Sequence, residues 1–437
     1  MRCWRDWRGS CPVKGAWIRP GPKPKRDLIY REIYGESGVS EITSQIRQEL
    51  SGLRASGLYR SLADITKVSP PHIFLKQDGR EVRLIDFSSN DYLGLSSHPA
   101  MKEAASRASD QWGAGSRASR LLSGNHPLYE RLEQASASLK GTEAALVFGS
   151  GYLANCGIIP ALASRSDLIL ADRQVHASII DGIRLSGARF KRFGHNDLSH
   201  LEGLLSDAAP RGFRRIVVVA ESLYSMDGDV APIEGLLELK DRFGFLLMVD
   251  EAHAVGVTGK EGCGLIPRHL AGQVDITIGT FGKALGSYGA FCASTAPMRE
   301  YLINRCRTAI FSTALPPPVL AASMKAIELL PDLEMERRTL ADRSHQLASF
   351  IRKELGQEAI GEMQIVSLVL GGSGLAVRLE NFLRQWGIFA RAIRPPTVPR
   401  GRERIRFSLT SCHGQEDVDL LKRALRHFFR DGRAQGS

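Results

Sequence analysis

No stretch of this sequence is long and apolar enough to cross a membrane. A membrane-spanning helix needs about 20 consecutive apolar residues, and the longest candidates, Ile216–Ala220 and Phe245–Val249, are far shorter. Their length and β-branched residues are typical of core strands instead. The N-terminus also lacks the apolar segment of a secretory signal. We therefore expect a protein that neither enters nor crosses a membrane.

Closely spaced cysteines are also missing. The seven cysteines are scattered along the chain and include no C-x-x-C pair. This pattern argues against a zinc site and against a framework of disulfides, and it suits a reducing compartment. We expect a cytoplasmic protein that binds no metal.

The excess of positive charge is not concentrated in one functional region. The net charge is +11, of which +5 falls in residues 1–38 and +6 in the remainder of the chain. A moderately basic body is compatible with an anionic substrate, but it lacks the clustered charge of a nucleic-acid-binding protein. We expect no nucleic-acid partner.

Residues 1–38 show no hydrophobic period, and no methionine follows Met1 until Met101. We interpret this segment as an unstructured or non-native extension, with translation starting near Val39. The intact mass of the natively expressed protein tests this hypothesis, and a full-length chain would contradict it.

The rest of the chain predicts an α/β fold. A helix over Glu41–Leu62 and a short hairpin at residues 73–86 come first. Unbroken apolar strands separated by helices then predict a mostly parallel central sheet with helices on both faces. The predicted strands are Ala144–Phe148, Leu168–Ala171, Ile216–Ala220, Phe245–Val249 and Val274–Ile278.

The pattern changes after about residue 325 to that of a smaller α+β unit. Its predicted helices span residues 333–355, 375–386 and 416–428, and its predicted strands span residues 365–370, 388–393 and 404–409. We therefore predict four segments, namely the extension (1–38), a helix and hairpin segment (39–85), a large domain (86–325) and a C-terminal domain (326–437).

A single lysine, Lys283, lies in a glycine-spaced loop directly after the predicted strand Val274–Ile278. Glycines let a bulky ligand approach the backbone, and a lysine in apolar surroundings loses its charge more easily. A neutral amine on a rigid strand end is what Schiff-base chemistry requires. A solvated loop lysine is the ordinary alternative for such a motif taken alone.

Polar side chains follow four of the predicted strands where each strand ends. They are Asp172 and His176, Glu221 and Ser225, Asp250 and His253, and Thr280 and Lys283. Ligands of parallel sheets bind at this edge. Asp250 ends an apolar strand and needs a cationic partner, which a protonated pyridine nitrogen would supply. Gly149–Gly151 precedes a helix and offers backbone N–H groups to a phosphate. Together these features predict a pyridoxal-phosphate site.

An NTPase is the competing interpretation, because the segment Val249–His253 contains the D-E-A-H motif of a class of helicases. That reading requires an upstream G-x-x-x-x-G-K-[ST] loop to hold the nucleotide phosphates. Only Gly279–Lys283 comes near, and it has the wrong spacing and lies downstream. A catalytically inactive binding scaffold is a further alternative, which the intact Lys283 and Asp250 disfavour.

Several motifs resemble the α-oxoamine synthases, which join an amino acid to an acyl-CoA with loss of CO₂. The matching segments, within a resemblance that runs from about residue 41 to 430, are Asn90–Leu95, Gly115–Arg117, Asp172–Ser178, Ser225–Gly228, Asp250–His253 and Thr280–Lys283. The resemblance implies a fold-type I pyridoxal-phosphate enzyme.

Within that family, Ala392–Pro399 and Ser312–Pro317 resemble the branch that serves biotin biosynthesis. This branch condenses L-alanine with pimeloyl-CoA or a pimeloyl-carrier protein. The alternative is a sister enzyme, such as glycine C-acetyltransferase or 5-aminolevulinate synthase, that uses glycine or another acyl-CoA.

The resemblance also implies a role for each matching residue. Lys283 would bond covalently to pyridoxal 5′-phosphate and act as the general base, Asp250 would pair with the ring nitrogen, and His176 would stack on the ring. The other implied cofactor contacts are Gly151, Tyr152 and Thr280 at the phosphate, Ser225 and His253 at the phenolic oxygen, and Ser312 and Thr313 at the phosphate of a partner subunit's cofactor. This sharing implies a homodimer. Implied substrate contacts are Arg406 for the amino acid, Arg60 and Thr397 for the acyl group, and Asn90 as a further substrate-binding residue.

Overall fold

The computed structural model describes residues 41–77, 79–361 and 363–434. The predicted extension, residues 1–38, lies outside them. The chain divides into two compact units, one ending at Ser61 and the other spanning Leu62–Ser437. In the first unit the predicted helix Glu41–Leu62 is too long at its C-terminal end. Helix α2 spans Glu41–Ala55, and Gly57 follows with a φ of 69° that ends the helix.

The second unit contains a seven-stranded sheet in the order β4-β10-β9-β8-β7-β5-β6. The bounds are β4 Ala144–Phe148, β5 Leu168–Asp172, β6 Arg189–Phe193, β7 Ile216–Glu221, β8 Leu246–Asp250, β9 Ile276–Thr280 and β10 Ala290–Ser294. Strands β9, β8, β7, β5 and β6 run parallel, and β10 is antiparallel to β9 and to β4. The predicted α/β class with a mostly parallel central sheet is confirmed.

Strands β6 and β10 were not predicted. Strand β6 lies at the sheet edge and carries exposed basic side chains, so it lacks an apolar run. Strand β10 is fully buried, but its alanines and its cysteine give only a weak strand signal.

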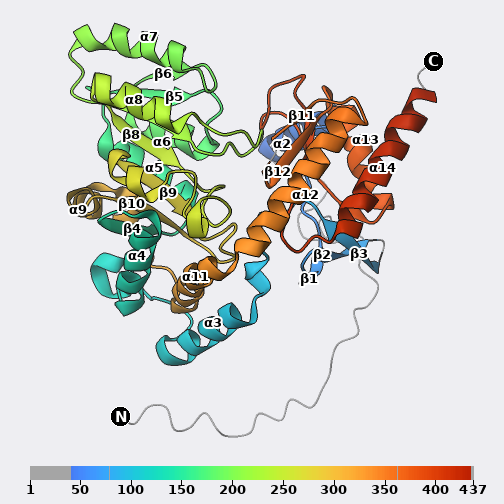
Figure 1. Ribbon diagram of the computed structural model, residues 1–437, viewed down its shortest axis with the longest axis horizontal. Coiled ribbons are helices and arrows are strands. Elements are labelled where there is room, and N and C mark those ends of the chain that lie inside the picture. Colours follow the sequence, from blue (N-terminus) through green and yellow to red (C-terminus); the bar gives the residue numbers. More distant parts are fainter. Residues whose placement is uncertain (1–40, 78, 362, 435–437) are drawn as a thin grey trace, which may run out of the picture. The chain divides into compact units, whose positions relative to one another are not determined.

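Helices cover both faces of this sheet, as Figure 1 shows. Ile169 and Val217 pack with α5 (Gly151–Leu162), α6 (Ala177–Ser186) and α9 (Ala296–Arg305). Their neighbours Leu170 and Val218 point to the opposite face and pack with α7 (Leu198–Ala208) and α8 (Ile233–Phe243). This alternation follows from the two-residue period of a strand.

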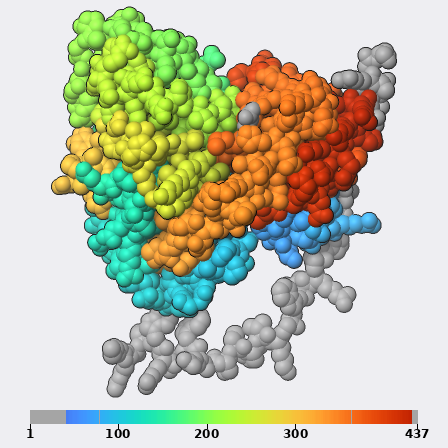
Figure 2. Space-filling view, viewed as in Figure 1, coloured from blue at the N-terminus to red at the C-terminus, as the bar shows by residue number. Residues whose placement is uncertain are grey.

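A second sheet, in the order β11-β12-β15-β14, is formed near the C-terminus. The elements of this region are α12 Glu334–Lys353, β11 Ala359–Ile360, β12 Ile365–Val369, α13 Ser373–Gln385, β14 Ala392–Ile393, β15 Arg404–Ser408 and α14 Gln415–Ala434. The other helices are α3 Pro99–Trp112, α4 Pro127–Lys140, α10 Arg307–Ile310 and α11 Pro317–Leu329. Figure 2 shows the C-terminal segments, in orange and red, beside the green and yellow segments that contain most of the large sheet.

The predicted continuous strand at residues 388–393 is wrong, because two short strands of different sheets replace it. Strand β13 (Ile388–Phe389) runs parallel to β3 (Arg80–Asp86) and joins β1 (Ile65–Ser69) and β2 (His72–Gln77) in one sheet. Strand β14 pairs with β15 instead. The hairpin near residue 80 thus shares a sheet with the C-terminal region. The domain boundaries proposed from the sequence remain predictions.

Among the described residues, no helix combines the length and the apolar character that a membrane span requires. The five described cysteines are all free thiols.

Candidate active site

The polar strand ends lie side by side at one edge of the large sheet. Strands β5, β7, β8 and β9 are consecutive neighbours, and they end at Asp172, Glu221, Asp250 and Thr280. Glu221 is directly opposite Asp250 in the ladder between β7 and β8. The convergence expected from the sequence is therefore present in the fold.

Asp250 is buried, and each of its carboxylate oxygens accepts a hydrogen bond. Its Oδ2 accepts from Asn155 Nδ2 at 2.8 Å and its Oδ1 accepts from the Ala252 backbone N–H at 2.9 Å. Asn155 also donates to Ser178 Oγ at 3.0 Å, and Ser178 Oγ lies 2.7 Å from His176 Nδ1. One chain of hydrogen bonds thus orients both Asp250 and His176.

Asn155 was missed by reasoning from the sequence. It lies on α5, an almost wholly apolar helix, and is only 1% exposed. An amide in such a helix must find a buried partner, and this was the available signal.

The amine of Lys283 has no ion-pair or hydrogen-bond partner among the residues that the structure describes. Its loop packs closely, because Gly286 has a φ of 60° and a Cβ there would lie 2.2 Å from the Ser96 nitrogen. Burial lowers the pKa of Lys283 to about 8, although the charges of Asp250 and Glu221 oppose this change. A substantial fraction of the amine is then neutral near physiological pH, as imine formation requires.

Glu221 is a second buried carboxyl beside Asp250. Burial raises its pKa to about 8, the charge of Asp250 adds to this effect, and Lys283 opposes it. Its Oε2 accepts from the Ser225 backbone N–H at 3.3 Å, whereas Oε1 has no partner among the described residues. Glu221 therefore supports the segment that carries Ser225.

His253, Tyr92, Arg406 and Asn90 form a second hydrogen-bonded group. Tyr92 Oη lies 2.7 Å from His253 Nδ1, and Arg406 Nη2 donates to Tyr92 Oη at 3.1 Å and to Asn90 Oδ1 at 3.2 Å. Burial, with Lys283 and Arg406 nearby, holds the pKa of His253 well below its usual range. Arg406 Nε is buried and has no partner among the described residues, so a donor remains available to an anion.

Gly151 and Tyr152 begin α5, whose N-cap is Ser150. Ser150 Oγ accepts from the Leu153 N–H at 3.1 Å. The earlier N–H groups of a first helical turn have no partner within the helix and favour an anion. Thr280 ends β9, and its Oγ1 donates to the Gly289 carbonyl at 2.9 Å.

Three predicted residues, Ser312, Thr313 and Thr397, do not join these groups in the part of the chain that the structure describes. Ser312 is half-buried and Thr313 is exposed, in the segment between α10 and α11. Thr397 is exposed in a turn closed by its N–H and the Arg394 carbonyl at 3.1 Å. Arg60 belongs to the unit that ends at Ser61. Their predicted contacts remain predictions.

Residues 82–425 match the protein family described as aminotransferase class I and II. The chain belongs to this family. An 8-amino-7-oxononanoate synthase of Geobacter sulfurreducens is 46% identical over 399 residues, which cover 90% of this chain and 100% of the relative.

Solved structures agree with this assignment. A structure of SPT with the PLP internal aldimine covers 91% of this chain and 99% of its own at 30% identity, with a TM-score of 0.82. The 8-amino-7-oxononanoate synthase of Francisella tularensis covers 80% of this chain and 98% of its own at 30% identity, with a TM-score of 0.67. The resemblance inferred from the motifs is confirmed.

Proposed function

We propose that this chain is an 8-amino-7-oxononanoate synthase. It condenses L-alanine with pimeloyl-CoA or a pimeloyl-carrier protein, releases CO₂ and the thiol, and thereby serves biotin biosynthesis. The observation that carries this proposal is the 46% identity to the Geobacter synthase across that protein's whole length. The organisation of the site supports it.

The cofactor of this family is pyridoxal 5′-phosphate, and the residues at the rim of the large sheet fit it. Lys283 offers an amine that no described residue pairs with, Asp250 offers a buried carboxylate, and α5 offers an N-terminus. When bound, pyridoxal phosphate supplies an aldehyde carbon for amines and a ring that withdraws electrons from the substrate Cα.

Each of the chain's own residues then has a separate role in the reaction. Asp250 holds a proton at the ring nitrogen, and His176 covers one face of the ring. Lys283 Nζ accepts the proton from Cα of alanine. That carbon forms a bond with the thioester carbonyl carbon, and the thiolate leaves. The carboxylate that came from alanine then departs as CO₂, and Cα takes up a proton in its place.

Arg406 is proposed to bind the carboxylate of alanine. Replacing it with lysine keeps the charge but removes the fork of donors. We expect KM for alanine to rise about 10- to 100-fold, since hydrogen bonds to charged groups contribute about 1.5–3 kcal/mol. Steady-state kinetics over a range of alanine concentrations measure this change. Arg402→Lys is the matched control, because Arg402 pairs with Glu358 in an exposed position, and an equal change there would contradict the assignment.

A homodimer is proposed because an exposed apolar cluster adjoins Ser312 and Thr313. The cluster consists of Leu121, Leu122 and Phe311, which are 56%, 80% and 69% exposed. A bridge between Ser119 and Thr313 brings its two segments together. Contiguous exposed apolar surface of this kind marks an interface.

We expect Phe311→Glu to convert the dimer into monomers that retain less cofactor, as measured by sedimentation and by cofactor absorbance. Met335→Glu is the matched control, because Met335 is also 69% exposed but lies on α12. A wild-type monomer that holds its cofactor normally would contradict the proposed dimer.

The proposed reaction is tested by a screen of amino acids and acyl thioesters with the holoprotein. Exchange of the α-proton of alanine, but not of glycine or serine, supports the proposal, as does thiol release with pimeloyl donors. Preference for glycine with another acyl-CoA would assign the chain to glycine C-acetyltransferase or 5-aminolevulinate synthase instead.

A further inference from the structure

The protein contains a partly buried histidine, His195, that lies between two carboxylates and has no role assigned above. His195 lies just after β6, and its side chain is 13% exposed. Its Nδ1 lies 3.0 Å from Asp172 Oδ1, and its Nε2 lies 2.6 Å from Asp229 Oδ2. A carboxylate oxygen accepts a hydrogen, so both ring nitrogens must donate, and only the protonated imidazolium can do that.

The surroundings support ionised carboxylates on both sides. Asp172 also accepts from the backbone N–H groups of Gln174 and Asn196, each at 2.8 Å. Asp229 also accepts from Asn196 Nδ2 at 3.0 Å. Burial alone would lower the pKa of His195, but the hydrogen bonds to Asp172 and Asp229 outweigh it and raise this pKa to about 9.

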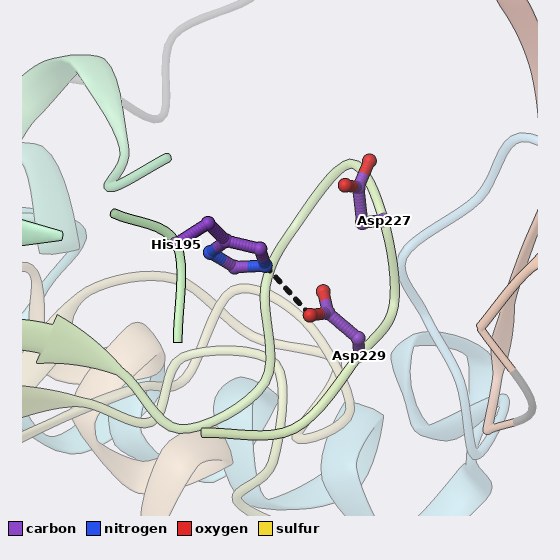
Figure 3. A group of neighbouring side chains, drawn as sticks. All are labelled: His195, Asp227 and Asp229. Atoms are coloured by element: carbon purple, nitrogen blue, oxygen red, sulfur yellow. Dashed lines mark hydrogen bonds and ion pairs between the residues drawn. The ribbon is translucent and has the colours of Figure 1, made fainter. Parts of the chain in front are cut away.

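A metal ion is the alternative occupant, because His195, Asp227 and Asp229 place possible ligand atoms within 4.8 Å of one another. Two observations argue against it. Both nitrogens of His195 already lie within hydrogen-bonding distance of carboxylate oxygens, and the carboxylate of Asp227 is paired with the buried Arg404. Figure 3 shows a hydrogen bond from the ring of His195 to Asp229 and none from the ring to Asp227. The imidazolium of His195 already supplies the positive charge that a metal ion would bring to these carboxylates.

The two carboxylates belong to the segments that carry proposed cofactor contacts. Asp229 lies in the loop from Ser222 to Ala231, which is closed by Ala231 N–H to Ser222 O at 3.0 Å and by Tyr224 N–H to Asp229 O at 3.0 Å. Ser225 is part of this loop. Asp172 ends β5, and the next four residues lead to His176, the N-cap of α6.

We propose that His195 is a positioning residue whose protonated ring ties the loop bearing Ser225 to the segment bearing His176. It fixes the separation of two side chains that contact the cofactor ring on different sides. This inference rests on the proposed function, since it assumes that Ser225 and His176 touch pyridoxal phosphate.

The groups that face His195 come from several elements. Asp172 comes from the end of β5, Asp229 and Asp227 come from the loop after β7, and the ring of Tyr224 meets the imidazole edge-on at a centroid distance of 4.4 Å. Asn196 follows it in the chain. Asp172 and Asp229 are the direct partners of the ring and set its charge.

The test uses a variant of similar size that changes one of the two ring donors into an acceptor. Glutamine places one donor and one acceptor at about the spacing of the two ring nitrogens, so His195→Gln sets an amide oxygen against one carboxylate. We expect the Kd of the apoprotein for pyridoxal phosphate to rise about 10-fold, and kcat to fall while KM for alanine changes little. Adding Asp229→Asn supplies a donor to the glutamine oxygen and should restore most of the affinity.

The control is His269→Gln, because His269 is exposed, and its Kd should equal that of the wild type. Nitrogen-15 NMR of the apoprotein labelled at histidine should show the signal of one histidine ring that stays doubly protonated at pH 8. This signal should be absent from the spectrum of His195→Gln. A ring that titrates at or below about 6.5, or a double variant no better than His195→Gln, would overturn the proposal.

Two further outcomes are decisive. Zn²⁺ that binds the wild type tightly, but not His195→Gln, would make the cluster a metal site and overturn the inference. A wild type that does not bind pyridoxal phosphate would refute the proposed function itself, whereas normal cofactor binding by a folded His195→Gln would refute only the role of His195. Thermal melting of each variant shows whether it is folded.

Discussion

Replacing Lys283 with alanine is expected to lower turnover by at least about 10³-fold, because the amine is both the covalent attachment point and the general base. A positioned general base alone contributes about 10²–10⁴-fold. The substitution should leave the fold intact, since the amine has no partner among the described residues. Asp250 also keeps the donors Asn155 and Ala252.

The measurement is kcat for thiol release with alanine and a pimeloyl thioester, together with the far-ultraviolet circular dichroism of each protein. Borohydride treatment of the wild-type holoprotein should attach the cofactor at position 283 and nowhere else. Lys260→Ala is the control, because Lys260 is exposed at the start of a short 3-10 helix, Lys260–Gly262. Full activity of Lys283→Ala, or a label at another lysine, would refute the proposed site.

Replacing Lys140 with methionine is expected to destabilise the protein by about 3–5 kcal/mol, because it leaves a buried charge without its partner. Lys140 and Glu251 form an ion pair in which both side chains are 0% exposed. Lys140 also donates to the Cys263 carbonyl. Glu251 accepts from the Leu265 and Ile266 N–H groups at 2.7 and 3.0 Å, so it cannot turn toward water without breaking the loop.

Denaturant unfolding measures this change in the free energy of unfolding. The matched control is Arg107→Ala, whose ion pair with Glu103 is exposed, with side chains 78% and 60% accessible. Its effect should stay within about 1 kcal/mol. Adding Glu251→Gln to Lys140→Met should recover part of the loss, because it removes the unpaired charge. Equal effects of the buried and exposed substitutions would contradict this account.

This ion pair also matters for the active site. Glu251 follows Asp250 directly in the chain, and its backbone N–H donates to the Ile278 carbonyl at 2.8 Å. The pair therefore anchors the segment between Asp250 and His253. Partial loss of cofactor affinity in Lys140→Met would follow from the same displacement.

Much of the site could be read from the sequence, because its residues follow apolar strands at a recognisable edge. The strands that end at Asp172, Glu221, Asp250 and Thr280 are parallel neighbours, so local pattern and sheet geometry together place them. Tyr92 lies within the motif Asn90–Leu95, which gives it no role of its own, although its hydroxyl joins His253 to Arg406. Its partners are distant in sequence, and no local pattern reveals them.

The sequence by itself determined the period of each strand and helix, and the glycine-spaced loop that presents Lys283. These features depend on neighbours within a few residues, where backbone geometry and side-chain burial decide the outcome. The tertiary structure alone decided the antiparallel insertion of β10, the pairing of β13 with β3, and the placement of Asn155. It also decided that His195 is held between two carboxylates, because those contacts form only when segments far apart in the chain are packed together and water is excluded.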